Sequence, residues 1–161
     1  MTKIFAHRGA SAYAPENTME AFELAAKQGA DGIELDVHVT KDGEVVVTHD
    51  EKIDRVSNGS GFIKDMTLRE LKRLSFHNHM ESYVGAGIPT LREVLEYVST
   101  TNMDVNIELK TGIYWYPQIE EKTAFIVQET GMHDRVIYSS FNHYSVMKMR
   151  EYDPAARTGL L

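Results

Sequence analysis

Cysteine is absent from all 161 residues of the sequence. Its absence excludes disulfide frameworks, thiolate metal sites and a cysteine nucleophile. Any metal bound by this chain must therefore be held by oxygen or imidazole ligands. The sequence also lacks an excess of basic residues, since 17 Lys and Arg stand against 24 Asp and Glu, a net charge of −7. This balance argues against a nucleic-acid-binding protein, and an anionic substrate would need local cations to recruit it.

Long apolar runs are absent as well. The first apolar stretch is only a few residues long and meets His7 and Arg8 at once. A secretory signal needs about 7–15 apolar residues, and a membrane-spanning helix needs about 20. We therefore expect a cytoplasmic location and no stable insertion into a membrane.

The composition that is present, 42% hydrophobic and 25% charged, is typical of a globular domain. Two periodicities alternate along the chain, one typical of short buried strands and the other of helices. Strands are expected over residues 3–6, 32–40, 45–48, 104–110, 135–141 and 157–161. Helices are expected over residues 19–27, 117–130 and 144–152, and two more begin at capping-box sequences at Thr67 and Thr90. This alternation indicates an α/β fold, with a parallel sheet and helices outside it.

Ionisable residues gather where the expected strands end. The carboxyl ends of parallel strands form one rim, and α/β folds bind their ligands at that rim. We therefore expect eight side chains to converge in one cleft: His7, Arg8, Glu34, Asp36, His49, Asp50, Glu108 and Lys110.

Three of these residues are candidate metal ligands. Glu34 and Asp36 lie two residues apart on one strand, so both carboxylates point to the same face. Two like charges this close are unfavourable unless a cation lies between them. Glu108 on a neighbouring strand supplies a third oxygen donor. Three carboxylates without sulfur suit Mg²⁺ or Ca²⁺ better than Zn²⁺, so we expect one divalent cation here.

Four other residues of the rim are suited to act on a bound substrate. Arg8 and Lys110 are cations that suit an anionic substrate, and arginine can hold a phosphate through two hydrogen bonds. His7 and His49 carry imidazoles, which are suited to general acid and base catalysis near neutral pH. Together with a metal ion, these groups predict hydrolysis of a phosphoester.

Each of these residues also has a purely structural interpretation. A strand-end histidine is more often structural than catalytic, and the carboxylate pair suits a solvated edge strand. Arg8 and Lys110 would equally suit a structural ion network. The collection of all of them at the same end of four strands favours the catalytic interpretation. Two weaker candidates are Asn17, which a role at a helix N-terminus explains equally well, and His38, which lies beyond the two carboxylates.

Five motifs occur in the order and spacing of one family: His7-Arg8-Gly9, Pro15-Glu16-Asn17-Thr18, Glu34-Leu35-Asp36-Val37, His49-Asp50 and Ile107-Glu108-Leu109-Lys110. With them the sequence resembles the glycerophosphodiester phosphodiesterase family over about residues 3–161. The resemblance implies a TIM-type (β/α)₈ barrel. It also implies a small-molecule glycerophosphodiester as substrate, cleaved to glycerol 3-phosphate and an alcohol.

The resemblance also implies roles for seven residues: metal ligands Glu34, Asp36 and Glu108, the acid–base pair His7 and His49, and the phosphate contacts Arg8 and Lys110. Residues 51–103 resemble the family's small insertion, which would help to set the alcohol that is accepted. Two alternatives stay open. One is a lysophospholipase D that cleaves a lipid-like diester at the same site, and the other is a non-catalytic phosphate- or polyol-binding module. A homo-oligomer also stays open.

The length sets a further expectation. A barrel of this type takes about 250 residues, with 200 near the lower limit, and eight strands. Only six strands are expected here. We therefore expect residues 1–161 to supply the N-terminal two thirds of a barrel, which is incomplete or is completed by a partner.

Overall fold

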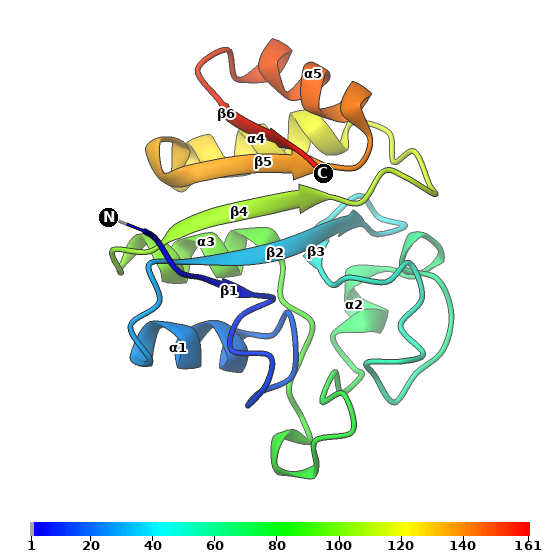
Figure 1. Ribbon diagram of the computed structural model, residues 1–161. Helices are drawn as coiled ribbons and strands as arrows, with labels where there is room; N and C mark the ends of the chain where they lie inside the picture. Colours follow the sequence, from blue (N-terminus) through cyan, green and yellow to red (C-terminus); the bar gives the residue numbers. More distant parts are fainter. Residues whose placement is uncertain (1) are drawn as a thin grey trace.

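The computed structural model describes residues 2–161, which form one six-stranded sheet (Figure 1). All six expected strands are present. Five of them are parallel neighbours, in the order β1 (Phe5–His7), β2 (Gly32–Val39), β4 (Asp104–Leu109), β5 (Val136–Ser140) and β6 (Arg157–Leu160). Over the described residues the sheet is open, with β1 and β6 at its two edges.

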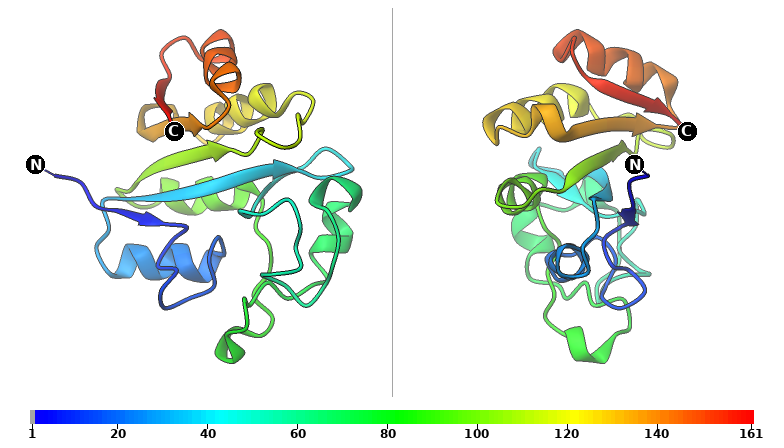
Figure 2. Two further views of the ribbon diagram at one scale, coloured as in Figure 1. Left: turned by 45° about the vertical axis from the view of Figure 1, so that its right-hand side comes forward. Right: turned by 60° about the vertical axis from the view of Figure 1, so that its left-hand side comes forward.

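Helices cover one face of this sheet, as expected: α1 (Met19–Lys27), α3 (Leu91–Ser99), α4 (Ile119–Glu129) and α5 (His143–Tyr152). They pack on alternate strand residues such as Leu35, Ile107 and Tyr138, which are almost fully buried. The views in Figure 2 show the sheet curving, with these helices on its outer side. Because side chains alternate across a strand, the inner side is left for polar residues. The arrangement is that of a (β/α) barrel wall that is not closed.

The third strand, β3 (Val45–Val47), departs from the parallel order. It follows the turn at residues 41–43 and pairs antiparallel with the end of β2, where Val37 faces Val47. Lys41-Asp42-Gly43 is a hairpin-type turn, and such a short turn joins antiparallel neighbours, so five of the six strands are parallel. This hairpin brings the chain back to the rim. The backbone N–H of Thr48 donates to the carbonyl of Asp36 at 3.0 Å, and His49 follows.

A second apolar cluster joins Val46 on β3 to the segment between β3 and α3, which contains η1 (Ile63–Asp65), α2 (Leu68–Leu71) and η2 (Glu81–Tyr83). Its buried members are Val46, Ile53, Val56, Ile63, Leu71, Phe76 and Ile88. This cluster is separate from the core between the sheet and the four outer helices. The segment therefore has packing of its own and is more than a loop.

The two predicted capping boxes are both present. Thr67 caps α2 and Thr90 caps α3, each accepting a hydrogen bond from the backbone N–H three residues ahead, where Glu70 or Glu93 returns the bond. These bonds satisfy amide groups that a helix N-terminus leaves without partners. None of the helices in the described part of the chain is long and apolar enough to cross a membrane.

Gly9 makes the close approach that joins β1 to α1. Its φ is +78°, and a Cβ at this position would lie 2.7 Å from the backbone carbon of Ala21. Gly29, just after α1, has the same φ of +78°, but a Cβ there would have nothing within 4 Å. The two glycines therefore separate the conformational requirement from the steric one.

We predict that Gly9→Ala lowers the free energy of unfolding by roughly 2–4 kcal/mol, the sum of a left-handed backbone and an overpacked contact. Gly29→Ala is the matched control and should cost roughly 1–2 kcal/mol, since only the backbone conformation is unfavourable there. Urea unfolding followed by circular dichroism measures both. Equal losses in the two variants would contradict the close contact at Gly9.

Candidate active site

The register of the sheet brings the predicted rim residues together. His7 on β1 lies beside Glu34 on β2, and Asp36 on β2 lies beside Glu108 on β4. The intervening strand residues point into the outer core, so these four side chains share the inner side. Arg8 and Lys110 follow directly after β1 and β4, and His49 and Asp50 follow β3 after one intervening residue. All eight residues expected in the cleft lie at this rim.

The three predicted metal ligands form a compact acidic cluster. One oxygen from each of Glu34, Asp36 and Glu108 lies within 4.8 Å of the others. Burial, followed by the charges of Asp36 and Glu108, raises the pKa of Glu34 to about 7. Asp36 is 1% exposed, and its Oδ1 has no hydrogen-bond partner among the described residues. A buried orphan oxygen within three carboxylates fits a hard divalent cation, which prefers oxygen ligands.

Arg8 lies against this cluster in a strained conformation. Its φ is +57°, and its backbone N–H donates to Glu34 Oε2 at 3.1 Å. Its Nε lies 3.5 Å from Asp36 Oδ2, and its Nη1 donates to Glu16 Oε1 at 3.1 Å. A left-handed backbone costs a non-glycine residue on the order of 1–2 kcal/mol. The surrounding bonds hold it in place, and a strained residue of this kind is frequent at functional sites.

Lys110 is the second cation at the cluster. Its Nζ donates to Glu108 Oε1 at 2.9 Å and lies 3.7 Å from Asp36 Oδ1. The same Nζ lies 3.2 Å from Nε2 of His49. Lys110 therefore joins the acidic cluster to one of the two predicted acid–base histidines.

Hydrogen-bond chemistry defines the tautomer of His49. An ammonium group has no acceptor, so Nε2 of His49 must accept the bond from Lys110. Nδ1 lies 2.6 Å from Asp50 Oδ1, and an ionised carboxylate has no donor, so Nδ1 must carry the proton. Burial raises the pKa of Asp50, but hydrogen bonds from Arg55 and His49 outweigh burial and lower that pKa to about 2, which keeps Asp50 ionised. His49 is thus held as a neutral imidazole whose Nε2 lone pair faces the cluster.

His38, a weak candidate from the sequence, is a buried residue that holds the backbone of His49. It is fully buried, and burial lowers the pKa of His38 to about 4, so its imidazole is neutral. Its Nε2 donates to the carbonyl of His49 at 3.0 Å, and its Nδ1 accepts from the hydroxyl of Tyr116 at 2.8 Å. His38 therefore positions the backbone of His49 and does not reach the rim itself.

His7 occupies the opposite side of the cluster. Its side chain is 70% exposed, and its Nε2 lies 3.7 Å from Glu34 Oε2. The two predicted acid–base histidines thus flank the acidic cluster, His7 beside Glu34 and His49 beside Lys110. Groups on either side of a bound phosphate are suited to act on the attacking and the leaving oxygen.

Glu16 and Arg55 also belong to the rim, although the sequence did not predict them as site residues. Asn17, a weak candidate from the sequence, contacts the acidic cluster directly. Asn17 has φ of +56°, is 2% exposed, and donates from Nδ2 to Asp36 Oδ2 at 2.9 Å. Glu16 accepts from Arg8 and from Arg55, which also bonds to Asp50. Glu16 and Asn17 lie in one of the five family motifs, whereas Arg55 lies in the segment between β3 and α3, outside all five motifs.

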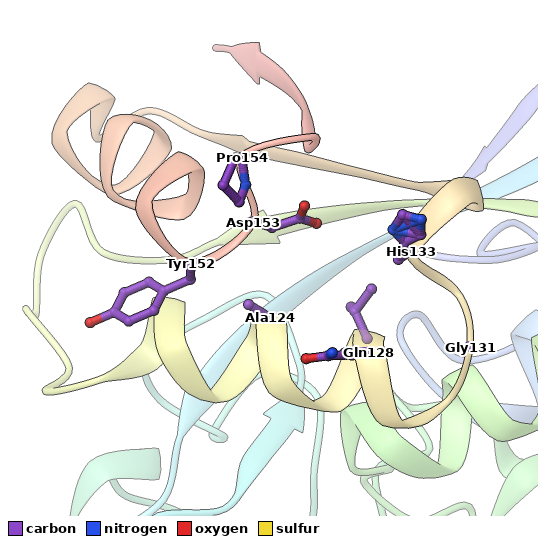
Figure 3. A pocket seen from close by; sticks show the side chains of 8 residues that line it. Ala124, Gln128, Gly131, His133, Tyr152, Asp153 and Pro154 are labelled. Atoms are coloured by element: carbon purple, nitrogen blue, oxygen red, sulfur yellow. The ribbon is translucent and has the colours of Figure 1, made fainter.

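Cavity size does not identify this site. A cavity of about 370 Å³ lies between α4, the turn before β5 and the end of α5, where Figure 3 shows Gln128, His133 and Asp153 at its wall. A smaller cavity of about 140 Å³ lies beside Glu108 and Lys110 at the rim. The larger cavity contains none of the eight rim residues. We therefore place the site by its chemistry.

The fold and the rim together define a class: a (β/α) barrel protein whose rim is suited to a divalent cation and an anionic ligand. The profile of the glycerophosphoryl diester phosphodiesterase family matches residues 7–161. The chain belongs to this family, as its motifs predicted.

Relatives from two bacteria share about half of the sequence. A glycerophosphodiester phosphodiesterase from Caldanaerobacter subterraneus is 50% identical over 161 residues, and one from Bacillus altitudinis is 48% identical over 163 residues. The matches cover 99% and 100% of this chain. The chain spans 66% of the length of each relative.

Solved structures are similar over nearly the whole chain. Glycerophosphodiester phosphodiesterase from Agrobacterium tumefaciens matches with a TM-score of 0.89 and 38% identity, covering 98% of this chain and 66% of that one. An Oleispira antarctica phosphodiesterase in complex with the product sn-glycerol-3-phosphate matches with a TM-score of 0.86 and 32% identity, covering 99% and 66%. These likenesses confirm the expected barrel fold, of which the described residues form an open part.

We predict that Mg²⁺ or Ca²⁺ stabilises this protein, because a cation bound among three carboxylates removes their repulsion. At 100 times its dissociation constant, a ligand contributes about 2.7 kcal/mol, which at this size raises Tm by roughly 5–10 °C. Glu34→Gln keeps an oxygen for the N–H of Arg8 but lacks the charge. Its Tm in EDTA should equal or exceed that of the wild type, and should respond little to either cation.

Differential scanning fluorimetry in EDTA, Mg²⁺ and Ca²⁺ measures these shifts. Glu96→Gln, an exposed glutamate on α3, is the matched control and should respond as the wild type does. A wild-type Tm that stays constant with both cations at millimolar concentration would show that the cluster holds neither.

Proposed function

We propose that this protein hydrolyses glycerophosphodiesters to glycerol 3-phosphate and an alcohol. The observation that carries the proposal is the convergence of an acidic cluster, two cations and two imidazoles at one rim of the sheet. The product complex of the Oleispira antarctica relative supports the same substrate class. A metal ion, cationic side chains that bind the phosphate and two groups that transfer protons are together suited to phosphodiester hydrolysis.

One divalent cation, Mg²⁺ or Ca²⁺, is held by Glu34, Asp36 and Glu108 in this proposal. When bound there, the cation would supply charge neutralisation to the phosphate. Arg8 and Lys110 bind the other phosphate oxygens, as charge-assisted hydrogen bonds from arginine and lysine do. With the cation bound, three carboxylates and two cationic side chains leave one positive charge. A phosphodiester monoanion balances that charge, which explains how an acidic protein recruits an anionic substrate.

The histidines take different roles in this proposal. His49 accepts the proton of the attacking oxygen, the substrate's own glycerol 2-hydroxyl or a water, because Asp50 holds its Nδ1–H and leaves the Nε2 lone pair toward the cluster. That oxygen bonds to phosphorus as the bond to the alcohol breaks. His7 is then the proton donor to the departing alkoxide, from its exposed place beside Glu34. Both imidazoles border the residues proposed to hold the cation and the phosphate, His7 beside Glu34 and His49 beside Lys110. The segment between β3 and α3, within residues 51–103, helps to set which alcohol is accepted.

Exposed apolar side chains near the rim favour a second candidate, lysophospholipase D activity on a lipid-like diester. Ile113 and Phe141 line the 140 Å³ cavity and are 72% and 68% exposed. Close to them in sequence, Trp115 and Tyr144 are in contact, with ring centroids 4.9 Å apart and ring planes tilted by 52°. An apolar rim of this kind suits an acyl chain. A non-catalytic binding module fits less well, since it has no use for a neutral His49 held in one tautomer.

The purified protein should release glycerol 3-phosphate from glycerophosphocholine. Release should stop in EDTA and return with Mg²⁺ or Ca²⁺, because the rim carboxylates need a cation to accept a phosphate. An enzyme-coupled assay for glycerol 3-phosphate measures this. Faster turnover of a lysophospholipid would favour the second candidate. Binding of glycerophosphocholine without turnover, in the presence of either cation, would establish a binding module.

The choice of leaving group should separate the two histidines. His7→Ala should lower kcat on glycerophosphocholine by about 10²–10⁴, because the departing alkoxide needs a proton. On a glycerophosphodiester of p-nitrophenol the loss should be less than about tenfold, because nitrophenolate leaves without protonation. His49→Ala should be impaired on both substrates, since each needs an activated nucleophile.

Steady-state kinetics with both diesters measure these losses, and His133→Ala is the matched control. His133 is exposed and pairs with Asp134, away from the rim, so its loss should not alter turnover. The reverse pattern, in which His49→Ala alone recovers with the nitrophenyl ester, would exchange the two roles.

A further inference from the structure

Arg55 lies between the two sides of the rim without belonging to the acidic cluster. Its Nε donates to Asp50 Oδ2 at 2.7 Å, and its Nη2 lies 3.3 Å from Asp50 Oδ1. Its Nη1 and Nη2 donate to Glu16 Oε2 and Oε1 at 2.9 and 2.7 Å. A single guanidinium therefore makes two-pronged contacts with two carboxylates. Lysine has no planar fork and cannot reproduce this geometry.

Each of the two carboxylates holds a different rim residue. Asp50 accepts from Nδ1 of His49 at 2.6 Å, and Glu16 accepts from Nη1 of Arg8 at 3.1 Å. The hydrogen bond from Arg55 is the largest cause that lowers the pKa of Glu16, so both carboxylates are ionised near neutral pH. Charges therefore alternate along a continuous chain from Arg8 through Glu16 and Arg55 to Asp50, which holds the neutral His49.

The backbone of Arg55 is fixed by the second apolar cluster. Its neighbours Ile53 and Val56 are 0% and 3% exposed and pack within that cluster. Ile53 accepts hydrogen bonds at its carbonyl from Ser57 and Val56, and its N–H donates to Gly61. The packing of the segment between β3 and α3 thus places this arginine, although its own side chain is 45% exposed.

We propose that Arg55 is a positioning residue that sets the phosphate contact Arg8 and the proton acceptor His49 together. Among the described residues it bonds only to Asp50 and Glu16, so it acts through them. The segment between β3 and α3 then contributes to the chemistry through one side chain, in addition to any contact with the alcohol. This inference rests on the proposed function for its kinetic effect, but its structural effect is measurable without turnover.

An ion network that only stabilises the fold and one that positions Arg8 and His49 predict different kinetics for variants of Arg55. Loss of a purely stabilising ion network would lower stability and leave kcat and KM of the folded protein unchanged. A positioning network leaves the fold intact and changes the rate, since a displacement of about 1 Å can cost on the order of 10² in rate. The network has two arms with different roles. The arm through Glu16 leads to Arg8 and substrate binding, and the arm through Asp50 leads to His49 and proton transfer.

The kinetic test uses Arg55→Gln, Arg55→Lys and a control, Arg73→Gln. Arg73 is exposed on the same segment, so its change alters net charge equally. Arg55→Gln should lower kcat by about 10- to 100-fold and also raise KM. Arg55→Lys should recover part of the loss, and Arg73→Gln should match the wild type. Glu16→Gln should act mainly on KM through Arg8, and Asp50→Asn mainly on kcat through His49.

A second kinetic result comes from the double variant Asp50→Asn with Arg55→Gln. Its loss in kcat should be close to that of Asp50→Asn alone, because both changes release the same arm. Fully additive losses would overturn the proposal, as would an Arg55→Gln enzyme whose kinetics match those of Arg73→Gln. Circular dichroism and Tm must show that each variant is folded before its rates are compared.

The test without turnover is long-range ¹H–¹⁵N NMR of histidine-labelled protein, at a pH where the imidazoles are neutral. In the wild type, His49 should show one tautomer with its proton on Nδ1. In Arg55→Gln a second tautomer should appear, while Arg73→Gln should keep the single one. An unchanged His49 spectrum in folded Arg55→Gln would overturn the positioning role. A wild type that shows the expected tautomer but releases no glycerol 3-phosphate would overturn the proposed function instead.

Discussion

The mutual repulsion of Glu34, Asp36 and Glu108 is the constraint on which the rest of the rim depends. Three carboxylates with oxygens within 4.8 Å of one another, partly removed from water, are unfavourable without compensation. Arg8 and Lys110 supply part of it at the edges of the cluster. The orphan oxygen of Asp36 and the raised pKa of Glu34 show that compensation by side chains is incomplete. The cluster could therefore hold a metal ion, whose charge would complete the compensation.

The parallel sheet holds this cluster together. Register places Asp36 beside Glu108 and His7 beside Glu34, and the alternation of side chains turns all four to the inner side. The outer side of the same strands is packed under four helices, with residues such as Leu35 and Ile107 fully buried. The free energy gained by that packing holds the strands in register against the repulsion at their ends. Stability and chemistry thus occupy opposite faces of the same strands.

The two apolar clusters have different roles. The larger one supports the wall of the barrel, whereas the smaller one folds the segment between β3 and α3. That segment reaches the rim through Arg55, whose partners are Glu16 and Asp50. The rim residues are therefore held both by the strands of the barrel wall and by Arg55 of the segment between β3 and α3. Backbone strain at Arg8 and Asn17 is compatible with this, because bonds on several sides maintain both conformations.

Local patterns were enough to predict the six strands, the two capping boxes, the family and the eight residues of the rim. These follow from periodicity and from motifs whose residues are close in the chain. The antiparallel pairing of β3 with β2 also follows from local sequence, since Lys41-Asp42-Gly43 is a hairpin-type turn. The contacts of Asn17 and Arg55, and the place of His38 as a buried support for His49, came instead from the three-dimensional arrangement. Those contacts join residues up to 78 positions apart, and hydrogen bonds over such separations depend on packing that no local pattern encodes.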